Sequence, residues 1–269
     1  EIKNKIFNNK RGFVIDNLGY EKQLNEKERT GLKNDKKVLS VIVPVYNNGK
    51  FLKYKCFNSL KRSSIFDKME ILLVDDGSTD LETLEIINEI TNKYNNVKAY
   101  YFNDGGSGSA SRPRNKGADL ASCKYITYLD PDNEAINDAY AKMVEILNDN
   151  ESVDMVVGNI IRSASDIRRI DYAKHIYNIS DDGVADNTYE LLKSTNLKVQ
   201  SIQALVVNRD IIIKNNLKMV EGAAGQDTLF FQELLLNTQK VKALNLDVHI
   251  YYAAVDNSVT NTVGRKFYE

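Results

Sequence analysis

The chain has 269 residues, of which 42% are hydrophobic and 27% are charged, and its formal net charge is −1. These values are typical of a globular protein of one large domain with additions, and they exclude a protein held on nucleic acid by bulk charge. No apolar stretch approaches the ~18 residues that a transmembrane helix needs. Two cysteines form no disulfide framework, and two histidines argue against a zinc site built from His and Cys.

Residues 1–37 differ from the rest because they are rich in Lys, Asn and Glu and carry few clustered apolar residues. We interpret this segment as a lead-in or linker, or as the remnant of a neighbouring domain. The alternative is a solvated tail. Since the chain begins at Glu1 rather than Met, we expect it to be a piece of a larger multidomain polypeptide.

From residue 38 onward, apolar runs alternate with segments of helical periodicity. Buried strands are predicted over 38–45, 69–80 with its closing acids and turn, 97–102, 124–130 and 153–159. Helices are predicted between them, over 50–62, 81–93, 110–121 and 135–148. This alternation indicates an α/β fold with a mostly parallel sheet, whose ligands sit beyond the carboxyl ends of the strands.

The alternation weakens after residue 160. Residues 162–186 are polar and are expected to be irregular. Further elements are predicted as a helix near 187–194, a strand near 201–207, a helix near 209–216, a Gly-rich loop opening a helix over 222–237, and one or two strands over 242–254.

The first two strands end in polar clusters. In PVYNN (44–48) a flat base could stack on Tyr46 or contact Pro44, with Asn47 beside it; a plain strand-to-helix turn is the alternative. In VDDGSTD (74–80) either Asp75 or Asp76 could bind a ribose hydroxyl or a base N–H. A simple helix cap would use one acid and not two.

The third strand leads into GGSGSASRPRNKG (105–117), which is not a dinucleotide fingerprint because Ser111 stands where the third glycine belongs. Arg112 and Arg114 lie near the start of the predicted helix. Two guanidinium groups, together with free helix N–H groups, suit a diphosphate. A flexible surface loop is the alternative reading.

The fourth strand ends in YLDPDNE (128–134), which places Asp130 and Asp132 at its tip. Mg²⁺ or Mn²⁺ is usually held by one or two carboxylates plus substrate phosphates, so this pair is a candidate metal-binding site. The alternative is a turn shaped by Pro131, with Asp130 capping the next helix. Later, Asp227 opens a predicted helix and could act as a general base, or it could simply be stabilised by the helix N-terminus.

Taken in order, these stretches resemble the family-2 glycosyltransferases of the GT-A fold. The motifs are PVYN, DDGST, an Arg-Asn-Lys-Gly helix start at 114–117, the Asp-x-Asp and a late Gly-x-Asp helix, and the match runs from about Val38 to Thr260. The resemblance implies a Rossmann-like, mostly parallel central sheet flanked by helices, with a C-terminal acceptor-side region. Residues 38–160 would form the nucleotide-sugar-binding half, and 161–269 the acceptor-binding and catalytic-base half of the same domain.

The resemblance also implies an inverting transfer of a hexosyl or N-acetylhexosaminyl group from a UDP-sugar to an acceptor hydroxyl. The acceptor would be a saccharide, a polyol-phosphate or a glycoprotein, in bacterial surface polysaccharide, teichoic acid or glycoprotein synthesis. The residues carried over to the nucleoside are Pro44, Tyr46, Asn47 and Asp76. Arg114 would lie near the base or the diphosphate with Arg112 beside it, and Asp130 would face the donor sugar or ribose. Asp132 would bind Mn²⁺ or Mg²⁺, and Asp227 would be the base.

The chain departs from the family pattern at two positions. Gln226 precedes the predicted base where Glu is usual, and Ala253 follows Tyr252 where many members carry Arg. Arg112 or Arg265 could replace that arginine. The third protein ligand of the metal stays open between Asp256 and His249. These departures keep a non-catalytic nucleotide-sugar-binding or scaffolding domain as the alternative function.

The remaining expectations concern the acceptor and the location of the protein. A basic and aromatic group hints at an anionic or sugar acceptor, with a solvated hairpin as an equal alternative; its members are Arg168, Arg169, Tyr172 and His175. A nucleotidyltransferase would want a glycine-rich signature after the first strand, which PVYNNG lacks. We expect a cytoplasmic location without a transmembrane segment, compatible with peripheral association at the inner face of the membrane, and no nucleic-acid partner.

Overall fold

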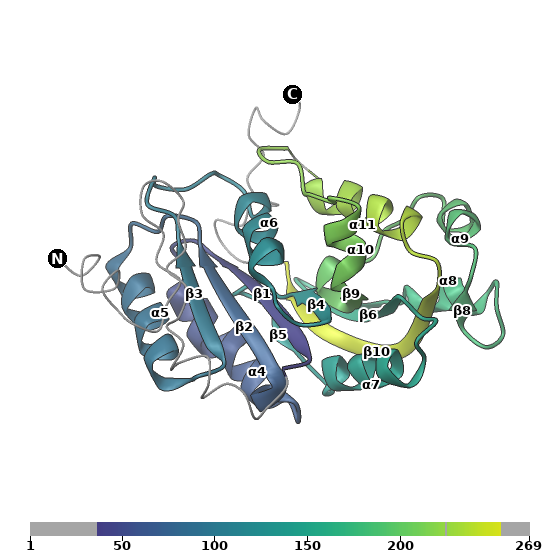
Figure 1. The fold of residues 1–269 in the computed structure, drawn as a ribbon, viewed down its shortest axis with the longest axis horizontal. Helices are drawn as coiled ribbons and strands as arrows, with labels where there is room; N and C mark the ends of the chain where they lie inside the picture. The colour runs from purple at the N-terminus through teal and green to yellow at the C-terminus, as the bar shows by residue number, and fades with distance from the viewer. Residues whose placement is uncertain (1–36, 224, 254–269) are drawn as a thin grey trace.

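The structure is a computed structural model that describes residues 37–223 and 225–253. The predicted lead-in, apart from Lys37, and the positions Asp256, Thr260 and Arg265 lie outside the described residues. One sheet runs through the molecule with helices packed on both of its faces (Figure 1).

The first half of the chain builds the parallel part of the sheet. Its strands are β1 (Leu39–Val45), β2 (Met69–Asp75), β3 (Val97–Tyr101) and β4 (Tyr125–Tyr128). Its helices are α3 (Gly49–Phe51), the π-helical η1 (Leu52–Phe57), α4 (Asn58–Lys61), the 3₁₀ turn η2 (Phe66–Lys68), α5 (Leu81–Lys93) and α6 (Ser111–Leu120). The predicted strands and helices of this half are confirmed, with bounds that shift by a few residues.

The second half adds shorter elements. Its strands are β5 (Glu134–Ala135), β6 (Met155–Ser163), β7 (Ile167–Ile170), β8 (Val184–Ala185), β9 (Leu205–Asn208) and β10 (Val241–Tyr252). Its helices are α7 (Ala139–Asp149), α8 (Ala173–Tyr177), α9 (Thr188–Ser194), the 3₁₀ turn η3 (Ile202–Ala204), α10 (Arg209–Lys214) and α11 (Gln226–Leu236).

The strand order is β3-β2-β1-β4-β9-β6-β10-β5, with β7 paired to β6 and β8 paired to β10. The neighbours β3-β2-β1-β4 are all parallel. Beyond them β9 is antiparallel to both β4 and β6, while β10 is parallel to β6. The predicted α/β class is confirmed, and the purely parallel part of the sheet is built by the first half of the chain.

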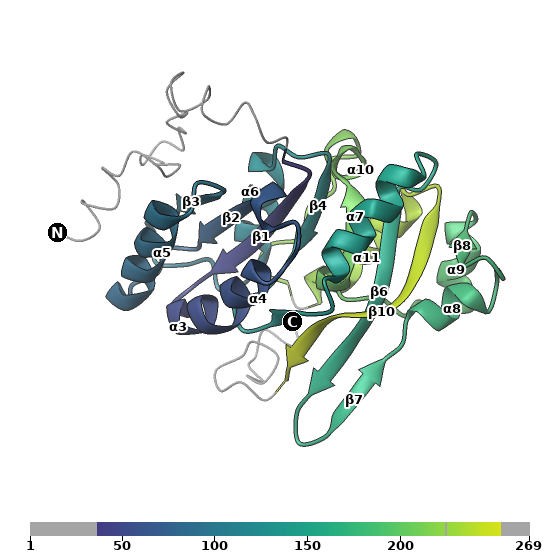
Figure 2. The same cartoon turned by 90° about the horizontal axis from the view of Figure 1, so that it is seen from below.

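Residues 162–186 were predicted to be irregular, and this was wrong in part. β6 continues to Ser163 and turns back as β7, which forms a hairpin that projects from the body (Figure 2). All four residues of β7, Ile-Arg-Arg-Ile, are exposed. A strand exposed on both faces needs no alternation of apolar and polar residues, so the periodicity that reveals a half-buried strand is absent.

Each central strand is buried on both faces, which explains its unbroken apolar run. Along β1, Val41 and Val43 belong to one core cluster with α5 and α7, whereas Ile42 belongs to the other cluster with α6 and α11. Successive side chains point to opposite faces of a strand, so one short run serves both cores. The carboxyl ends of β1, β2 and β4 therefore sit firmly between two helical layers.

Helix α6 lies close to the sheet at Gly117. A Cβ atom added there would stand 2.4 Å from Cγ2 of Ile42, in the middle of β1. We expect Gly117→Val to lower the free energy of unfolding by about 1–3 kcal/mol through overpacking. Urea unfolding would measure this, with Asp119→Ala as the control because Asp119 makes only an exposed ion pair with Lys218. An unchanged midpoint would show that Ile42 moves aside freely.

Candidate active site

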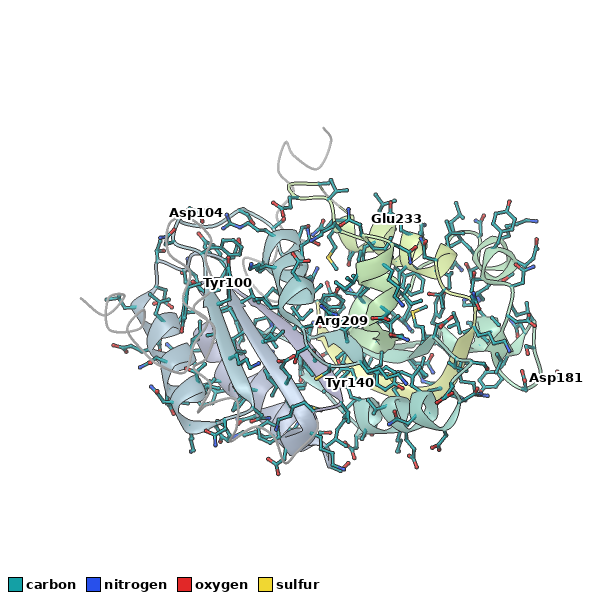
Figure 3. The ribbon with its side chains drawn as sticks, in the orientation of Figure 1. Tyr100, Asp104, Tyr140, Asp181, Arg209 and Glu233 are labelled. Atoms are coloured by element: carbon teal, nitrogen blue, oxygen red, sulfur yellow. The ribbon has the colours of Figure 1, made fainter. Side chains whose placement is uncertain are left out.

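The polar strand ends predicted from the sequence meet at one edge of the sheet. β1, β2 and β4 run parallel, so the segments that follow Val45, Asp75 and Tyr128 emerge on the same side. Figure 3 shows Asp104 beyond the end of β3, whereas Tyr100 lies lower along that strand. The helix α6, which carries both arginines of the Gly/Ser segment, begins at this edge.

The first strand end is held together by Asn47. Its side-chain Oδ1 accepts the N–H groups of Thr79 and Asp80, each at 2.9 Å, so the amide joins the loop after β1 to the loop after β2. Pro44 is buried inside β1 opposite Val74 and does not line the crevice surface. Pro44 is thus part of the buried strand, whereas Asn47 is exposed at the strand end while it joins the two loops.

Tyr46 is the exposed member of this group. Its side chain is 44% exposed, and its hydroxyl donates to the carbonyl oxygen of Gly105 at 3.0 Å. The ring lies against Gly106, where a Cβ atom would meet Cε2 of Tyr46 at 2.6 Å. Gly106 has φ +102, so glycine is needed both for the backbone and for the ring above it. One edge of a flat aromatic surface thus stays open to a ligand.

Asp76 anchors the Gly/Ser loop and Arg112. Its Oδ1 accepts from Nε of Arg112 at 2.7 Å, and its Oδ2 accepts from both the N–H and the hydroxyl of Ser107 at 2.8 Å. Arg112 also donates to both carboxylate oxygens of Asp104, at 2.5 and 2.8 Å. The hydrogen bonds that Arg112 donates to Asp104 are the main reason that the pKa of Arg112 is raised. Arg112 is therefore clamped between two carboxylates.

Arg114 and Asp130 form the central ion pair of the site. Nη2 of Arg114 lies 2.6 and 2.8 Å from the two carboxylate oxygens of Asp130, and the arginine side chain is 7% exposed. Gln203 completes the arrangement, because its Nε2 donates to Asp130 at 2.9 Å and its Oε1 accepts the N–H of Asp130 at 2.8 Å. Sequence reasoning missed Gln203, which comes from η3 and carries no motif.

Asp132 is a half-buried carboxylate without an ion pair among the described residues. Burial first, and then the neighbouring charge of Asp130, raise its pKa to about 6. Such an acid is stabilised by an added cation, which fits the proposed metal ligand. In residues 37–223 and 225–253 there is no group of three His, Cys, Asp or Glu that could hold a metal ion. The residues thus fit a hard cation held by Asp132, with substrate phosphates as further ligands.

His249 lies near this group, because the charge of Asp130 acts to raise its pKa. It is fully buried on β10 opposite Ala135, and neither ring nitrogen has a hydrogen-bond partner within the part of the chain that the structure describes. Burial lowers its pKa to about 4, so the ring is neutral. Its role as a third metal ligand therefore stays a prediction, and a neutral side chain of the buried core is the alternative.

Asp227 lies in the first turn of α11. Gly225, with φ +71, makes the turn into the helix, and the Asp227 side chain is exposed. Burial lowers the pKa of Arg114, but the charges of Asp130 and Asp227 raise it above its ordinary value overall. The charge on Asp227 is thus close enough to act on Arg114. The fold brings the predicted base to the same site as the Asp-x-Asp segment.

The basic and aromatic group of the second half is dispersed. Tyr172 is buried in the core beneath α11. Arg169 is occupied by ion pairs with Asp171 and Asp247. Arg168 lies on the exposed hairpin strand β7. Tyr172 and His175 are in ring contact, with centroids 5.7 Å apart, and a role of this group towards an acceptor stays a prediction.

The order of strands, the crossing helices and the carboxylates at the strand ends are those of a GT-A fold. A family model described as "Glycosyl transferase family 2" matches residues 40–193, which is more than half of the chain. The chain therefore belongs to glycosyl transferase family 2.

Two similar relatives come from bacteria. The Escherichia coli glycosyltransferase YibD is 25% identical over 81% of this chain and 62% of its own length. The Staphylococcus aureus poly(ribitol-phosphate) beta-N-acetylglucosaminyltransferase TarP is 26% identical over 84% of this chain and 65% of its own length. The chain thus spans less than two thirds of either relative.

Solved structures show the same fold. The Staphylococcus aureus protein TarS, residues 1–349 in complex with UDP-GlcNAc, has a TM-score of 0.71 at 20% identity, with 86% of this chain and 63% of that chain covered. The mannosyltransferase PcManGT of Pyrobaculum calidifontis, in complex with GDP-Man and Mn²⁺, has a TM-score of 0.56 at 14% identity, with 84% of this chain and 62% of that chain covered. In the part of our chain that the structure describes, no helix has the length and apolar character to cross a bilayer.

Proposed function

We propose that this chain transfers a sugar from a UDP-sugar to an acceptor hydroxyl, with inversion at the anomeric carbon. The observation that carries the proposal is the convergence of Asp130, Asp132 and Asp227 around the buried guanidinium of Arg114. Family membership and the UDP-GlcNAc complex of TarS support a nucleotide-sugar donor.

The donor would lie along the strand ends. The nucleobase of the donor would lie against the ring of Tyr46 and the loop held by Asp76. The diphosphate would run past the start of α6 towards Asp132. Asp130, fixed by Arg114 and Gln203, presents a rigid carboxylate to the hydroxyls of the sugar or ribose. Mn²⁺ or Mg²⁺ on Asp132 would neutralise the charge that develops on the leaving diphosphate.

The inverting transfer needs one general base. Asp227 would take the proton of the acceptor hydroxyl while that oxygen attacks the anomeric carbon. The bond from that carbon to the diphosphate oxygen breaks, and UDP leaves with the electron pair. Attack opposite the leaving group inverts the configuration. Asp227 suits this role because its carboxylate is exposed and its charge acts on Arg114.

For the acceptor we propose a polyol-phosphate polymer of the cell wall. Several relatives carry names of this chemistry, including TarP, the poly(ribitol-phosphate) beta-glucosyltransferase of Bacillus spizizenii and the minor teichoic acid protein GgaA of Bacillus subtilis. The hydroxyls of such a polymer are suitable nucleophiles for the base proposed above.

The function is tested by release of UDP. The protein would be incubated with a panel of UDP-hexoses and UDP-N-acetylhexosamines, with and without a polyol-phosphate acceptor, in Mn²⁺ and in EDTA. We expect acceptor-dependent UDP release from one donor that EDTA abolishes. If the donor binds but no UDP is released with any acceptor, the result would instead favour a non-catalytic nucleotide-sugar-binding domain. UDP release that is unaffected by EDTA would contradict the proposed role of the metal.

A further inference from the structure

A lysine outside all the motifs reaches the same site. Lys55 lies in η1, a six-residue π-helical turn between α3 and α4. π-Helical turns are rare, and they occur frequently at functional sites. This one carries Cys56 into the core and leaves Lys55 half-buried.

The ammonium group of Lys55 is held against aromatic rings. Its Nζ lies 3.5 Å from the ring centroid of Tyr252 and 5.3 Å from that of Phe51. The Tyr252 hydroxyl donates to Oε1 of Glu134 at 2.9 Å, and its N–H donates to Oδ1 of Asn133 at 3.2 Å. Both acceptors directly follow Asp132, so Lys55 faces the Asp-x-Asp segment.

Lys55 lies near Asp132, because its charge opposes the rise in the pKa of that acid that burial causes. Among the described residues Lys55 has no ion pair, whereas Lys50 pairs with Glu82 and Lys53 pairs with Glu89 on the same helical stretch. The arginines of the site differ from Lys55, because Arg112 and Arg114 are bound to acids already. A cation held over ring faces keeps its N–H donors available.

We propose that Lys55 binds the diphosphate of the nucleotide sugar, an inference that rests on the proposed function. Its N–H groups donate to phosphate oxygens beside Asp132 and help to neutralise the charge on the departing UDP. Lysine acts here as a point charge, and the aromatic faces fix its stem without competing for the hydrogen bonds.

The experiment compares the binding of UDP and of uridine by calorimetry, in Mn²⁺ and in EDTA. Lys55→Met keeps the apolar stem and removes the charge, Lys55→Arg restores the charge, and Lys53→Met is the matched control on the same turn. We expect Lys55→Met to weaken UDP binding roughly 10- to 100-fold and to leave uridine binding unchanged. Lys55→Arg should recover most of the affinity, and Lys53→Met should bind as the wild type does.

Three outcomes would overturn the proposal. UDP affinity of Lys55→Met within twofold of the wild type removes Lys55 from the diphosphate site while the proposed function stands. An equal loss of UDP and uridine binding assigns Lys55 to local structure, which a lowered melting temperature would confirm. A wild-type protein that binds neither ligand contradicts the proposed function itself.

Discussion

Asp227→Asn is expected to lower kcat for sugar transfer by about 10²- to 10⁴-fold, because the amide cannot take the proton of the acceptor hydroxyl. The side chain is exposed in the first turn of α11, and among residues 37–223 and 225–253 it accepts only the N–H of the following residue, Thr228, at 3.0 Å. The substitution keeps the size of the side chain and should leave the fold intact. Initial rates of UDP release at saturating donor and acceptor would measure the effect.

The expected loss is confined to turnover. UDP binding to Asp227→Asn should stay within a few-fold of the wild type, since in the proposed function this carboxylate serves the acceptor and not the diphosphate. Glu233→Gln is the matched control, since it removes a carboxylate from the same helix about two turns further on (Figure 3). Undiminished turnover in Asp227→Asn would assign the base to another residue.

The parallel half of the site was predictable because its signals are local. Apolar runs such as residues 124–130 are long enough to be read as strands, and parallel strands place their carboxyl ends together. Asp130 and Asp132 could therefore be assigned to one edge from the sequence alone. The motif order then added Asp227, which is nearly 100 residues away in the chain.

Other features could not be predicted because they depend on tertiary contacts. Gln203 touches Asp130 across 73 positions of sequence, and no spacing rule connects η3 with the end of β4. Asn47 was expected at the nucleoside, yet its side chain joins two loops, a use that depends on the register of β1 and β2. Lys55 was passed over because a helical pattern does not reveal a π-helical turn.

Asp132→Asn is expected to raise stability and to weaken metal-dependent donor binding. Burial raises the pKa of Asp132 from its ordinary value to about 6, so the charged form disfavours the fold. The acid has a pKa near 4 in the unfolded chain and about 6 in the folded protein. The stability that its protonated form contributes is therefore complete below pH 4 and is lost as the pH rises to 6. At pH 7 the asparagine variant should therefore be more stable than the wild type by about 1–3 kcal/mol.

The same carboxylate should impose a pH dependence on the donor site. In the wild type, UDP affinity in Mn²⁺ should increase from pH 5 to pH 7, because the metal binds the ionised acid. In Asp132→Asn the affinity should be lower by roughly 10- to 100-fold at pH 7 and nearly independent of pH over that range. Calorimetric titration with UDP at pH 5, 6 and 7 and thermal unfolding would measure both effects, with the exposed Glu85→Gln as the control. A variant that gains stability but keeps the wild-type UDP affinity in Mn²⁺ would show that Asp132 is a strained acid and not a metal ligand.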